Sequence, residues 1–462
     1  MMRECSRLYH KKGGIMDYSY LEVSQMLEKH PLLKEKQSYR NIYLSLLKYY
    51  TKKYSENDLW ANATINLYIN KLTEYREDQS DKENINRTVR RVMSTRFKPF
   101  RLYTYRYCFM YDCMFINALK DANKAKRIYE DITEYLTNNC KAKMSPVFDS
   151  LYSSYCETGD SRIDEYIKTC WSENRAFAKT ELTRIAITAN MSAGKSTLIN
   201  AIVGKKVNRT QQESCTAKIH YIVNKPYEDG LNYEYDHLLD LDADMQTLMD
   251  DNPNNTSDEI VVGTHFFTVG TDSQRVWLVD TPGVNSSKDI ALKHMTENYL
   301  KNNTADLLIY LINGEQAGTD DDKKHLMFVQ RNYHGRVLFV INKIDRYKKK
   351  EDSIKKTIEN AISELKEIGF VAPEIVPVSS YAAFLAKQVI EGIDIDEDEA
   401  DEFNGMLRRL KRPEYRLEQY YPEWIQEKLH NINRTSEAMD LLFQSGILHL
   451  EQMLYSIKKH ND

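Results

Sequence analysis

The sequence predicts a doubly wound, mostly parallel α/β sheet that is preceded by an all-α helical region. Glycine is absent between Ile15 and Glu157, which is typical of consecutive helices joined by short polar loops. After about residue 180, short apolar runs alternate with turns and helical patterns, as in a sheet of parallel strands with crossover helices. The 462 residues, of which 42% are hydrophobic and 29% charged, suffice for two or three globular domains.

The helical region is expected over residues 16–178, where Leu, Tyr, Lys and Glu are abundant. The first fifteen residues are interpreted as an extension before Met16. The only prolines in the glycine-free stretch are Pro31, Pro99 and Pro146. A series of helices is therefore the simplest structure for this part of the chain.

Seven apolar runs are expected to form the strands of the sheet. They occupy 184–188, 219–223, 264–269, 275–280, 305–312, 336–342 and 374–379. In such sheets ligands bind at the carboxyl ends of the strands. This second domain is predicted over 179–460, with insertions at about 224–262 and 388–440.

A phosphate-binding loop is predicted directly after the first strand, where residues 189–197 read ANMSAGKST. Such a loop turns backbone N–H groups toward phosphates and adds a lysine and a hydroxyl for Mg²⁺. Gly194, Lys195 and Ser196 complete the second half of the pattern, whereas Ala189 replaces its first glycine. The nucleotide contacts are assigned to Asn190, Met191, Ser192, Ala193, Gly194, Lys195, Ser196 and Thr197.

Two further motifs are expected near the γ-phosphate. The sequence DTPG at 280–283 ends a strand, where Asp280 can hold Mg²⁺ through water and the Gly283 N–H can reach the phosphate. A threonine before the second strand would add its hydroxyl to Mg²⁺ and its carbonyl to the attacking water. Thr216 is preferred over Thr210 because it directly precedes that strand. The predicted metal ligands are Ser196, Thr216 and Asp280.

The sequence NKID at 342–345 predicts which base is bound. A carboxylate can accept hydrogen bonds from N1–H and the 2-amino group of guanine, and adenine has neither donor, so Asp345 selects guanine. Asn342 would brace the loop, and the stem of Lys343 would cover the purine. The backbone N–H groups of Ser379 and Ser380 are expected near guanine O6. Together, the motifs predict a GTPase that uses GTP and GDP as substrate and product, with Mg²⁺ as cofactor.

The motifs also resemble those of the dynamin-like large GTPases, a superfamily of P-loop GTPases, and especially the bacterial members. The resemblance rests on SAGKSTLIN at 192–200, DTPGVN at 280–285, NKID, and VPVSSYAAFLA at 376–386. It covers about 181–387 and resumes at 445–457, which looks like the closing helix of such a domain. It implies a dynamin-type GTPase domain over 179–460, with the helical domain in front of it.

The resemblance implies how hydrolysis is assisted. Val284 stands where many small GTPases carry a water-orienting glutamine. In dynamin-like enzymes, dimerisation across the nucleotide face assists hydrolysis in place of this glutamine, together with P-loop side chains and a monovalent cation. Ser192 matches the family's P-loop serine, but Met191 replaces the glutamine of eukaryotic dynamins. Catalysis is therefore assigned to Lys195, Ser192 and Thr216, with a slow basal rate that self-association raises.

Other segments have alternative interpretations. Residues 236–259, a predicted helix and loop, are a solvated insertion or a partner surface. The segment 87–106 has seven basic and no acidic residues, and it pairs with acidic neighbours or contacts phosphates of lipid or RNA. The segment 391–416 changes from acidic to basic, which predicts intramolecular charge pairing or a mobile arm. No spacing typical of a metal site occurs, and Cys108 and Cys113 have no zinc-ligand pattern around them.

Charge, apolar runs and cysteine content indicate where the protein acts and what it binds. The net charge of −4 gives no global reason to expect nucleic acid, and no apolar run approaches the ~18–20 residues that cross a bilayer. Seven cysteines without a CxxC pair fit a reducing compartment. We expect a cytoplasmic homodimer, with an unknown protein partner for the helical domain and peripheral membrane contact at the inner face as an option.

Three functional hypotheses follow from these observations. The leading one is a self-associating, dynamin-like GTPase. The second is a regulatory switch whose helical domain binds a protein or RNA partner according to nucleotide state. The third is a scaffold that holds GTP with little turnover.

Overall fold

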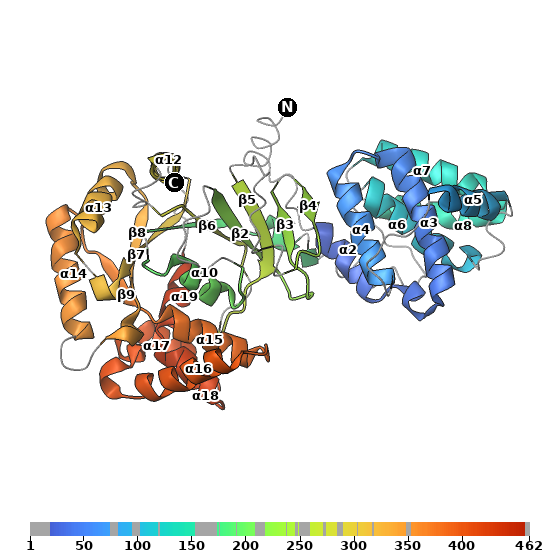
Figure 1. Ribbon diagram of the computed structural model, residues 1–462. Helices are drawn as coiled ribbons and strands as arrows, with labels where there is room; N and C mark the ends of the chain where they lie inside the picture. The colour runs from blue at the N-terminus through green and yellow to red at the C-terminus, as the bar shows by residue number, and fades with distance from the viewer. Residues whose placement is uncertain are drawn as a thin grey trace. The chain divides into compact units, whose positions relative to one another are not determined.

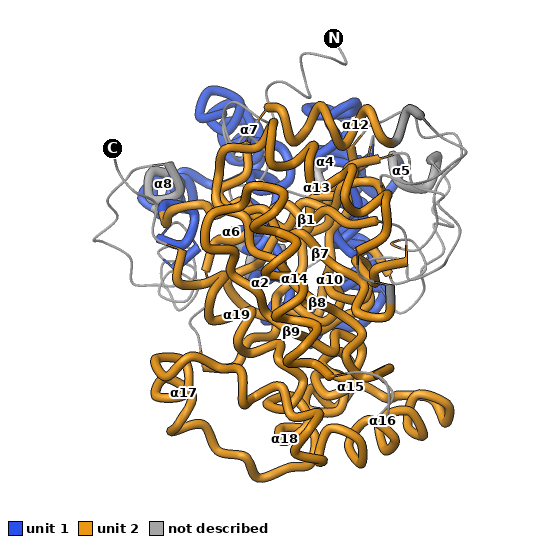
Figure 2. The backbone as a smooth tube through the Cα atoms, turned by 90° about the vertical axis from the view of Figure 1, so that its left-hand side faces the viewer, with its two compact units in different colours: residues 1–179, 238–242 blue, residues 180–237, 243–462 orange. Residues whose placement is uncertain are grey.

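The computed structural model describes residues 19–73, 82–94, 102–118, 121–152, 173–174, 176–190, 192–207, 218–236, 238–244, 248, 259–270, 274–283, 290–302, 304–316, 318–347 and 353–457. The chain divides into two compact units, which Figure 2 shows in different colours. Unit 1 comprises 1–179 and 238–242, and unit 2 comprises 180–237 and 243–462. Among the described helices, none combines the length and the hydrophobicity needed to cross a membrane.

Unit 1 is a helical assembly (Figure 1). Its helices are α2 (Ser19–Glu28), η1 (Pro31–Lys34), α3 (Gln37–Ser55), α4 (Leu59–Leu72), α5 (Lys82–Ser94), α6 (Leu102–Asn117), α7 (Ala122–Glu134) and α8 (Asn138–Tyr152). Aspartates at the polar breaks act as N-caps. Asp58 accepts the N–H of Ala61 at 3.0 Å, and Asp121 accepts the N–H of Lys124 at 2.9 Å. Helix α3 packs on α4, α5 and α6.

A buried carboxylate joins three helical segments of unit 1. Asp112 on α6 accepts the Tyr68 hydroxyl at 2.7 Å, and it also accepts the hydroxyl of Tyr43. The Nε2 atom of His30 lies 3.0 Å from the second carboxylate oxygen. Because all four side chains are buried, these hydrogen bonds replace the water that the carboxylate loses on folding.

Cys108 lies in the same cluster, next to His30 and Asp112, two side chains of types that can bind metals. Their spacing in the sequence did not predict this cluster. The Sγ atom of Cys108 lies 3.1 Å from His30 Nε2 and 3.7 Å from the Asp112 carboxylate. However, His30 Nδ1 accepts the N–H of Leu32 at 3.3 Å, so Nε2 carries the ring proton and donates it to Asp112. The group is therefore a hydrogen-bonded core and not a ready metal site.

Unit 2 contains the sheet. Its strands are β1 (Thr183–Ala189), β2 (Ile219–Lys225), β3 (Tyr233–Tyr235), β5 (Glu259–His265), β6 (Val276–Asp280), β7 (Leu307–Asn313), β8 (Arg336–Asn342) and β9 (Glu374–Pro377). They lie in the order β3-β5-β2-β6-β1-β7-β8-β9. Only the β2–β6 and β3–β5 pairs are antiparallel among these neighbours, so the predicted mostly parallel sheet is confirmed.

Helices cover the sheet in two groups (Figure 1). Helix α10 (Lys195–Val203) packs on α15 (Ser380–Ile390) and α19 (Ile447–Tyr455), whereas α13 (Asp320–Asn332) packs on α12 (Ile290–Lys301) and α14 (Ile354–Ile368). The central strands are almost wholly buried, as expected for a sheet covered on both faces.

The bounds predicted for the strand after the first insertion are wrong. The strand expected at 264–269 is β5, which ends at His265, because Asn224 Oδ1 takes the N–H of Phe266 at 2.8 Å. The segment 236–259, predicted as a helix followed by a loop, contains a short strand, β4 (Leu239–Asp240), near its start, and most of its later residues lie outside the described part of the chain. Asp240 accepts the N–H of Asp242 at 2.9 Å, which forms a turn directly after this strand.

The second insertion folds into helices. These are α16 (Glu397–Leu410), η5 (Pro413–Tyr415), η6 (Leu417–Tyr420), α17 (Glu423–Leu429) and α18 (Glu437–Gln444). Helices α15, α16 and α18 lie side by side (Figure 1). Lys411 pairs with Glu437 at 3.0 Å, and Glu399 pairs with Lys206 at 2.7 Å. The predicted intramolecular charge pairing is therefore present.

Candidate functional site

The predicted phosphate loop connects β1 to α10 at the carboxyl edge of the sheet. Ser192 and Gly194 have φ values of +63° and +88°, so the backbone turns sharply before α10 begins at Lys195. A Cβ at Gly194 would lie 2.5 Å from the Asn342 side-chain amide, so glycine is required there. Ala189 ends β1 outside the left-handed region, which explains why an alanine is accepted at the first position of the pattern.

Amide side chains from two adjacent strands hold the carbonyl groups of this loop. Asn342, at the end of β8, donates to the Ala193 carbonyl at 3.0 Å. Asn313, at the end of β7, donates to the Ser192 carbonyl at 3.4 Å. The two asparagines are register partners in parallel strands, and this places both amides at the same edge. Asn313 was not predicted, although its position as the last residue of a parallel strand was an available signal.

Lys195 forms an ion pair with Asp280. Strand β6, which ends at Asp280, is paired with β1, so the carboxylate lies beside the start of α10. The hydroxyl of Thr281 donates to the Ile187 carbonyl at 2.9 Å and thereby holds the chain after β6 against β1. Gly283 follows, and it is half-buried.

The residues predicted as metal ligands fit a magnesium ion by their chemistry. Mg²⁺ prefers hard oxygen donors, and Ser196 offers a hydroxyl and Asp280 a carboxylate. Ser196 and Thr197 stand in the first turn of α10, directly after Lys195. The ion pair with Lys195 places the Asp280 carboxylate next to the start of α10, where Ser196 directly follows Lys195 in the sequence. When bound, Mg²⁺ would neutralise charge on the phosphates.

The predicted base-binding residues follow β8. The hydroxyl of Ser379 donates to Asp345 Oδ1 at 2.6 Å, and this fixes the orientation of the buried carboxylate. Lys343 has a φ of +64°, and its Nζ lies 3.8 Å from the Glu315 carboxylate. Burial, together with the nearby positive charge of Arg346, lowers the pKa of the Lys343 ammonium.

The backbone N–H groups of Ser379 and Ser380 differ from their predicted role at guanine O6. Ser379 N–H donates to the Ser445 carbonyl at 2.8 Å. Ser380 N–H donates to Asn342 Oδ1 at 3.1 Å. The reason is tertiary, because the start of α19 approaches this loop and Asn342 reaches it from β8. In the structure, Ser379 supports Asp345 through its hydroxyl, and Ser380 supports Asn342.

Four residues discussed for the site lie outside the described part of the chain. They are Met191, Thr210, Thr216 and Val284. The roles given to them stay predictions.

The arrangement of β1, the phosphate loop and α10, with Asp280 at Lys195 and Asp345 beyond β8, defines a P-loop GTPase domain. Residues 185–344 match the family model described as "Dynamin family". This match confirms the predicted P-loop GTPase domain and agrees with the resemblance to the dynamin-like superfamily.

Similarity to individual proteins is lower and partial. GTPase Era of Haemophilus influenzae is 25% identical over 178 residues, which cover 38% of this chain and 44% of that protein. GTPase Der of Geotalea uraniireducens is 25% identical over 236 residues, which cover 50% and 43% of the two chains. The chain thus spans less than half the length of these relatives.

Solved structures were also compared. Era of Aquifex aeolicus bound to GDP·AlF4⁻ has 20% identity and a TM-score of 0.27, covering 47% of this chain and 59% of that chain. Toc33 of Arabidopsis thaliana in complex with GDP and Mg²⁺ has 12% identity and a TM-score of 0.30, covering 47% and 76%.

Proposed function

We propose that this protein is a Mg²⁺-dependent GTPase that hydrolyses GTP to GDP and phosphate. The observation that carries the proposal is the convergence of Lys195, Asp280 and Asp345 at one edge of the sheet. Lys195 and Asp280 form an ion pair at the head of α10, and Asp345 is held ready by Ser379. A phosphate site and a guanine site thus lie on adjoining loops of one domain.

The residues act by positioning and by electrostatics, which is what phosphoryl transfer demands. The turn at Ser192 and Gly194 directs backbone N–H groups toward the phosphates, and Lys195 adds positive charge. When nucleotide enters, the ammonium of Lys195 leaves Asp280 for the phosphates. Asp280 and Ser196 are then available to hold Mg²⁺.

We further propose a dynamin-like activation by self-association. Ser192 is exposed on the loop that would face a second copy, and the family match supports this mode. A homodimer across the nucleotide face would complete each site, with a monovalent cation near Ser192 and Thr216 on the metal. The protein would act in the cytoplasm, with peripheral contact at the inner membrane face.

The test is GTP turnover per protomer against protein concentration, in potassium and in sodium buffers with Mg²⁺. We expect the rate to rise with concentration and to be higher in one of the two cations. Lys195→Ala should lower turnover by on the order of 10²-fold, because a charge on the phosphates is lost. Lys206→Ala, at the other end of α10 and paired with Glu399, is the matched control. Full turnover in Lys195→Ala would refute the site.

The second candidate function is a regulatory switch, in which unit 1 binds a protein or RNA partner according to nucleotide state. The observation that favours it is the exposed basic surface of α5, which includes Arg87 and Arg90. A slow rate that does not depend on concentration supports this switch. Sedimentation with anionic vesicles that is lost on Arg87→Glu/Arg90→Glu supports the membrane role instead.

A further inference from the structure

We propose that Asp322 on α13 is a positioning residue of the phosphate loop, acting through Asn190. This inference rests on the proposed nucleotide site and deepens it. Asn190 is the first residue after β1 and therefore starts the loop. Its side-chain amide donates to the Asp322 carboxylate, which lies 132 residues further along the chain. Because Asp322 is only 7% exposed, water competes little for this contact.

Asp322 is itself held in place by the start of α13. Thr319, the N-cap residue of the helix, donates its hydroxyl to the second carboxylate oxygen at 2.9 Å. The same hydroxyl oxygen accepts the N–H of Asp322 at 3.3 Å. Both carboxylate oxygens therefore have donors, and the oxygen that receives Asn190 has a defined direction.

A second contact fixes α13 against the end of β1. His325 stands one helical turn after Asp322, and its Nε2 lies 3.0 Å from the Thr188 hydroxyl. Thr188 and Asn190 are two residues apart at the strand end, so both can face the same helix. Asp322 and His325 are three apart on α13 and lie on one face of it. The pair of contacts sets the position of α13 along β1.

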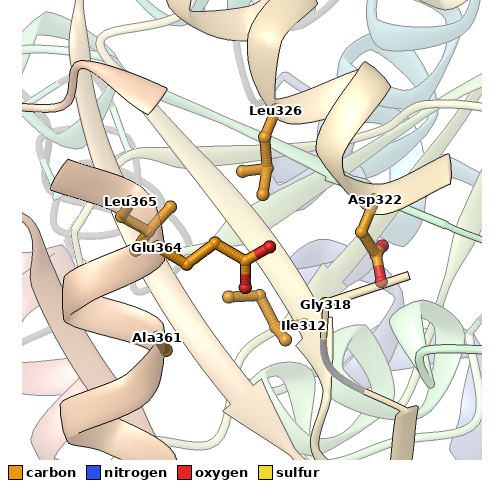
Figure 3. A pocket seen from close by; sticks show the side chains of 7 residues that line it. All are labelled: Ile312, Gly318, Asp322, Leu326, Ala361, Glu364 and Leu365. Carbon is orange, nitrogen blue, oxygen red and sulfur yellow. The ribbon is translucent and has the colours of Figure 1, made fainter. Parts of the chain in front are cut away.

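Beside Asp322 lies a small cavity of about 20 Å³ (Figure 3). Asp322 and Glu364 are its acidic members, and the remaining wall includes Ile312, Leu326 and Leu365. This volume is close to that of one water molecule. A change of the carboxylate to an amide can therefore be accommodated here without displacing the apolar core.

The consequence for the site is preorganisation. The bond to Asp322 fixes the side chain of Asn190 and thereby holds the loop at its beginning. Asn313 and Asn342 hold the loop at Ser192 and Ala193. A loop that is held at these points loses less freedom when the nucleotide binds, and this raises affinity. Both oxygens of the Asp322 carboxylate accept hydrogen bonds, from Asn190 and from Thr319.

The test uses the affinity of the full chain for fluorescently labelled GDP. In Asp322→Asn one acceptor oxygen becomes an amide donor, so the side chain cannot accept from both Asn190 and Thr319. We expect the Kd to rise about tenfold, since a hydrogen bond to a charged group is lost. Asp321→Asn is the matched control, because it removes the same charge at an exposed neighbouring position. Equal losses in the two variants would overturn the proposal.

A double-mutant cycle separates positioning from a general structural effect. Asn190→Ala should weaken GDP binding by a similar factor, and adding Asp322→Asn to it should cause no further loss. Additive losses would show that Asp322 does not act through Asn190. If Asp322→Asn fails to fold, Thr319→Ala takes its place in the same cycle, with a smaller expected loss.

The outcome for the proposed function is distinguishable. A wild type that binds GDP but does not turn GTP over refutes the proposed hydrolysis, while the cycle still measures the role of Asp322. A wild type that binds no guanine nucleotide refutes both.

Discussion

The side-chain amide of Asn342 lies 3.0 Å from the carbonyl oxygen of Ala193, so the predicted base-binding sequence is bonded directly to the predicted phosphate loop. The other end of the same side chain accepts the Ser380 N–H. One asparagine thus connects three loops around the proposed nucleotide site. A substitution in the predicted base-binding sequence is therefore expected to alter the phosphate loop directly, through Asn342 and not through the strands of the sheet.

Asp345→Asn should exchange guanine for xanthine specificity. Ser379 already donates to Asp345 Oδ1, so in the variant the amide oxygen stays with Ser379 and the amide nitrogen faces the base. That donor opposes the 2-amino group of guanine but pairs with the 2-carbonyl of xanthine. Competition between labelled GDP and xanthosine diphosphate measures the change. A variant that still prefers GDP would contradict the assignment of Asp345.

The second insertion should support guanine binding through Tyr347. Arg409 and Tyr415 donate to the Tyr347 carbonyl at 3.0 and 3.4 Å, directly after the base-binding residues. Arg409→Ala is expected to raise the Kd for GDP by about three- to tenfold, the equivalent of one hydrogen bond. Arg408→Ala, at the exposed neighbouring position, should leave the Kd unchanged. Equal affinities in both variants would show that the insertion does not support the base site.

Asp112→Asn should destabilise unit 1. The amide cannot accept from Tyr43, Tyr68 and His30 together, so buried donors lose a partner. We expect about 3 kcal/mol lower free energy of unfolding, measured with urea and followed by tyrosine fluorescence. Glu130→Gln, exposed on α7, is the control.

Zinc should not raise the melting temperature of the wild type, because the Nε2 atom of His30 carries a proton. A zinc-dependent rise that Cys108→Ala abolishes would contradict the hydrogen-bonded interpretation of this cluster.

Acid should weaken unit 2 through two buried histidines. Burial lowers the pKa of His325 to about 4 and the pKa of His449 to about 4. In the unfolded chain both titrate near pH 6.5, so the unfolded state binds more protons between these values. Their stabilising contribution is complete above pH 6.5 and is lost as the pH falls toward 4. From pH 7.5 to pH 5 the loss should be about 2 kcal/mol for each histidine.

Urea unfolding at several pH values measures this loss. His325→Gln and His449→Gln should each make the free energy of unfolding less dependent on pH, whereas His430→Gln, at an exposed position, should not. An unchanged pH dependence in the buried-site variants would contradict the prediction.

Most strands of the sheet could be predicted because each one contains a short run of apolar residues. The strand predicted at 264–269 ends earlier than expected, at His265, although the next residue, Phe266, is also apolar. Its N–H is taken by Asn224, and a partner on another strand decides where the ladder ends. Hydrophobic pattern alone carries no information about such a partner.

The amino-acid sequence alone predicts the phosphate loop, the aspartate that ends β6 and the assignment of guanine selection to Asp345. Each is a short contiguous motif whose chemistry depends on spacing along the chain. The hydrogen bond between Asn190 and Asp322, and the bonds of Asp112 with His30, Tyr43 and Tyr68, are visible only in the folded structure. Asn190 and Asp322 lie 132 residues apart, and His30 and Asp112 lie 82 residues apart. Whether two distant polar groups meet depends on how helices and strands pack, and a local pattern does not encode the direction or the distance between them.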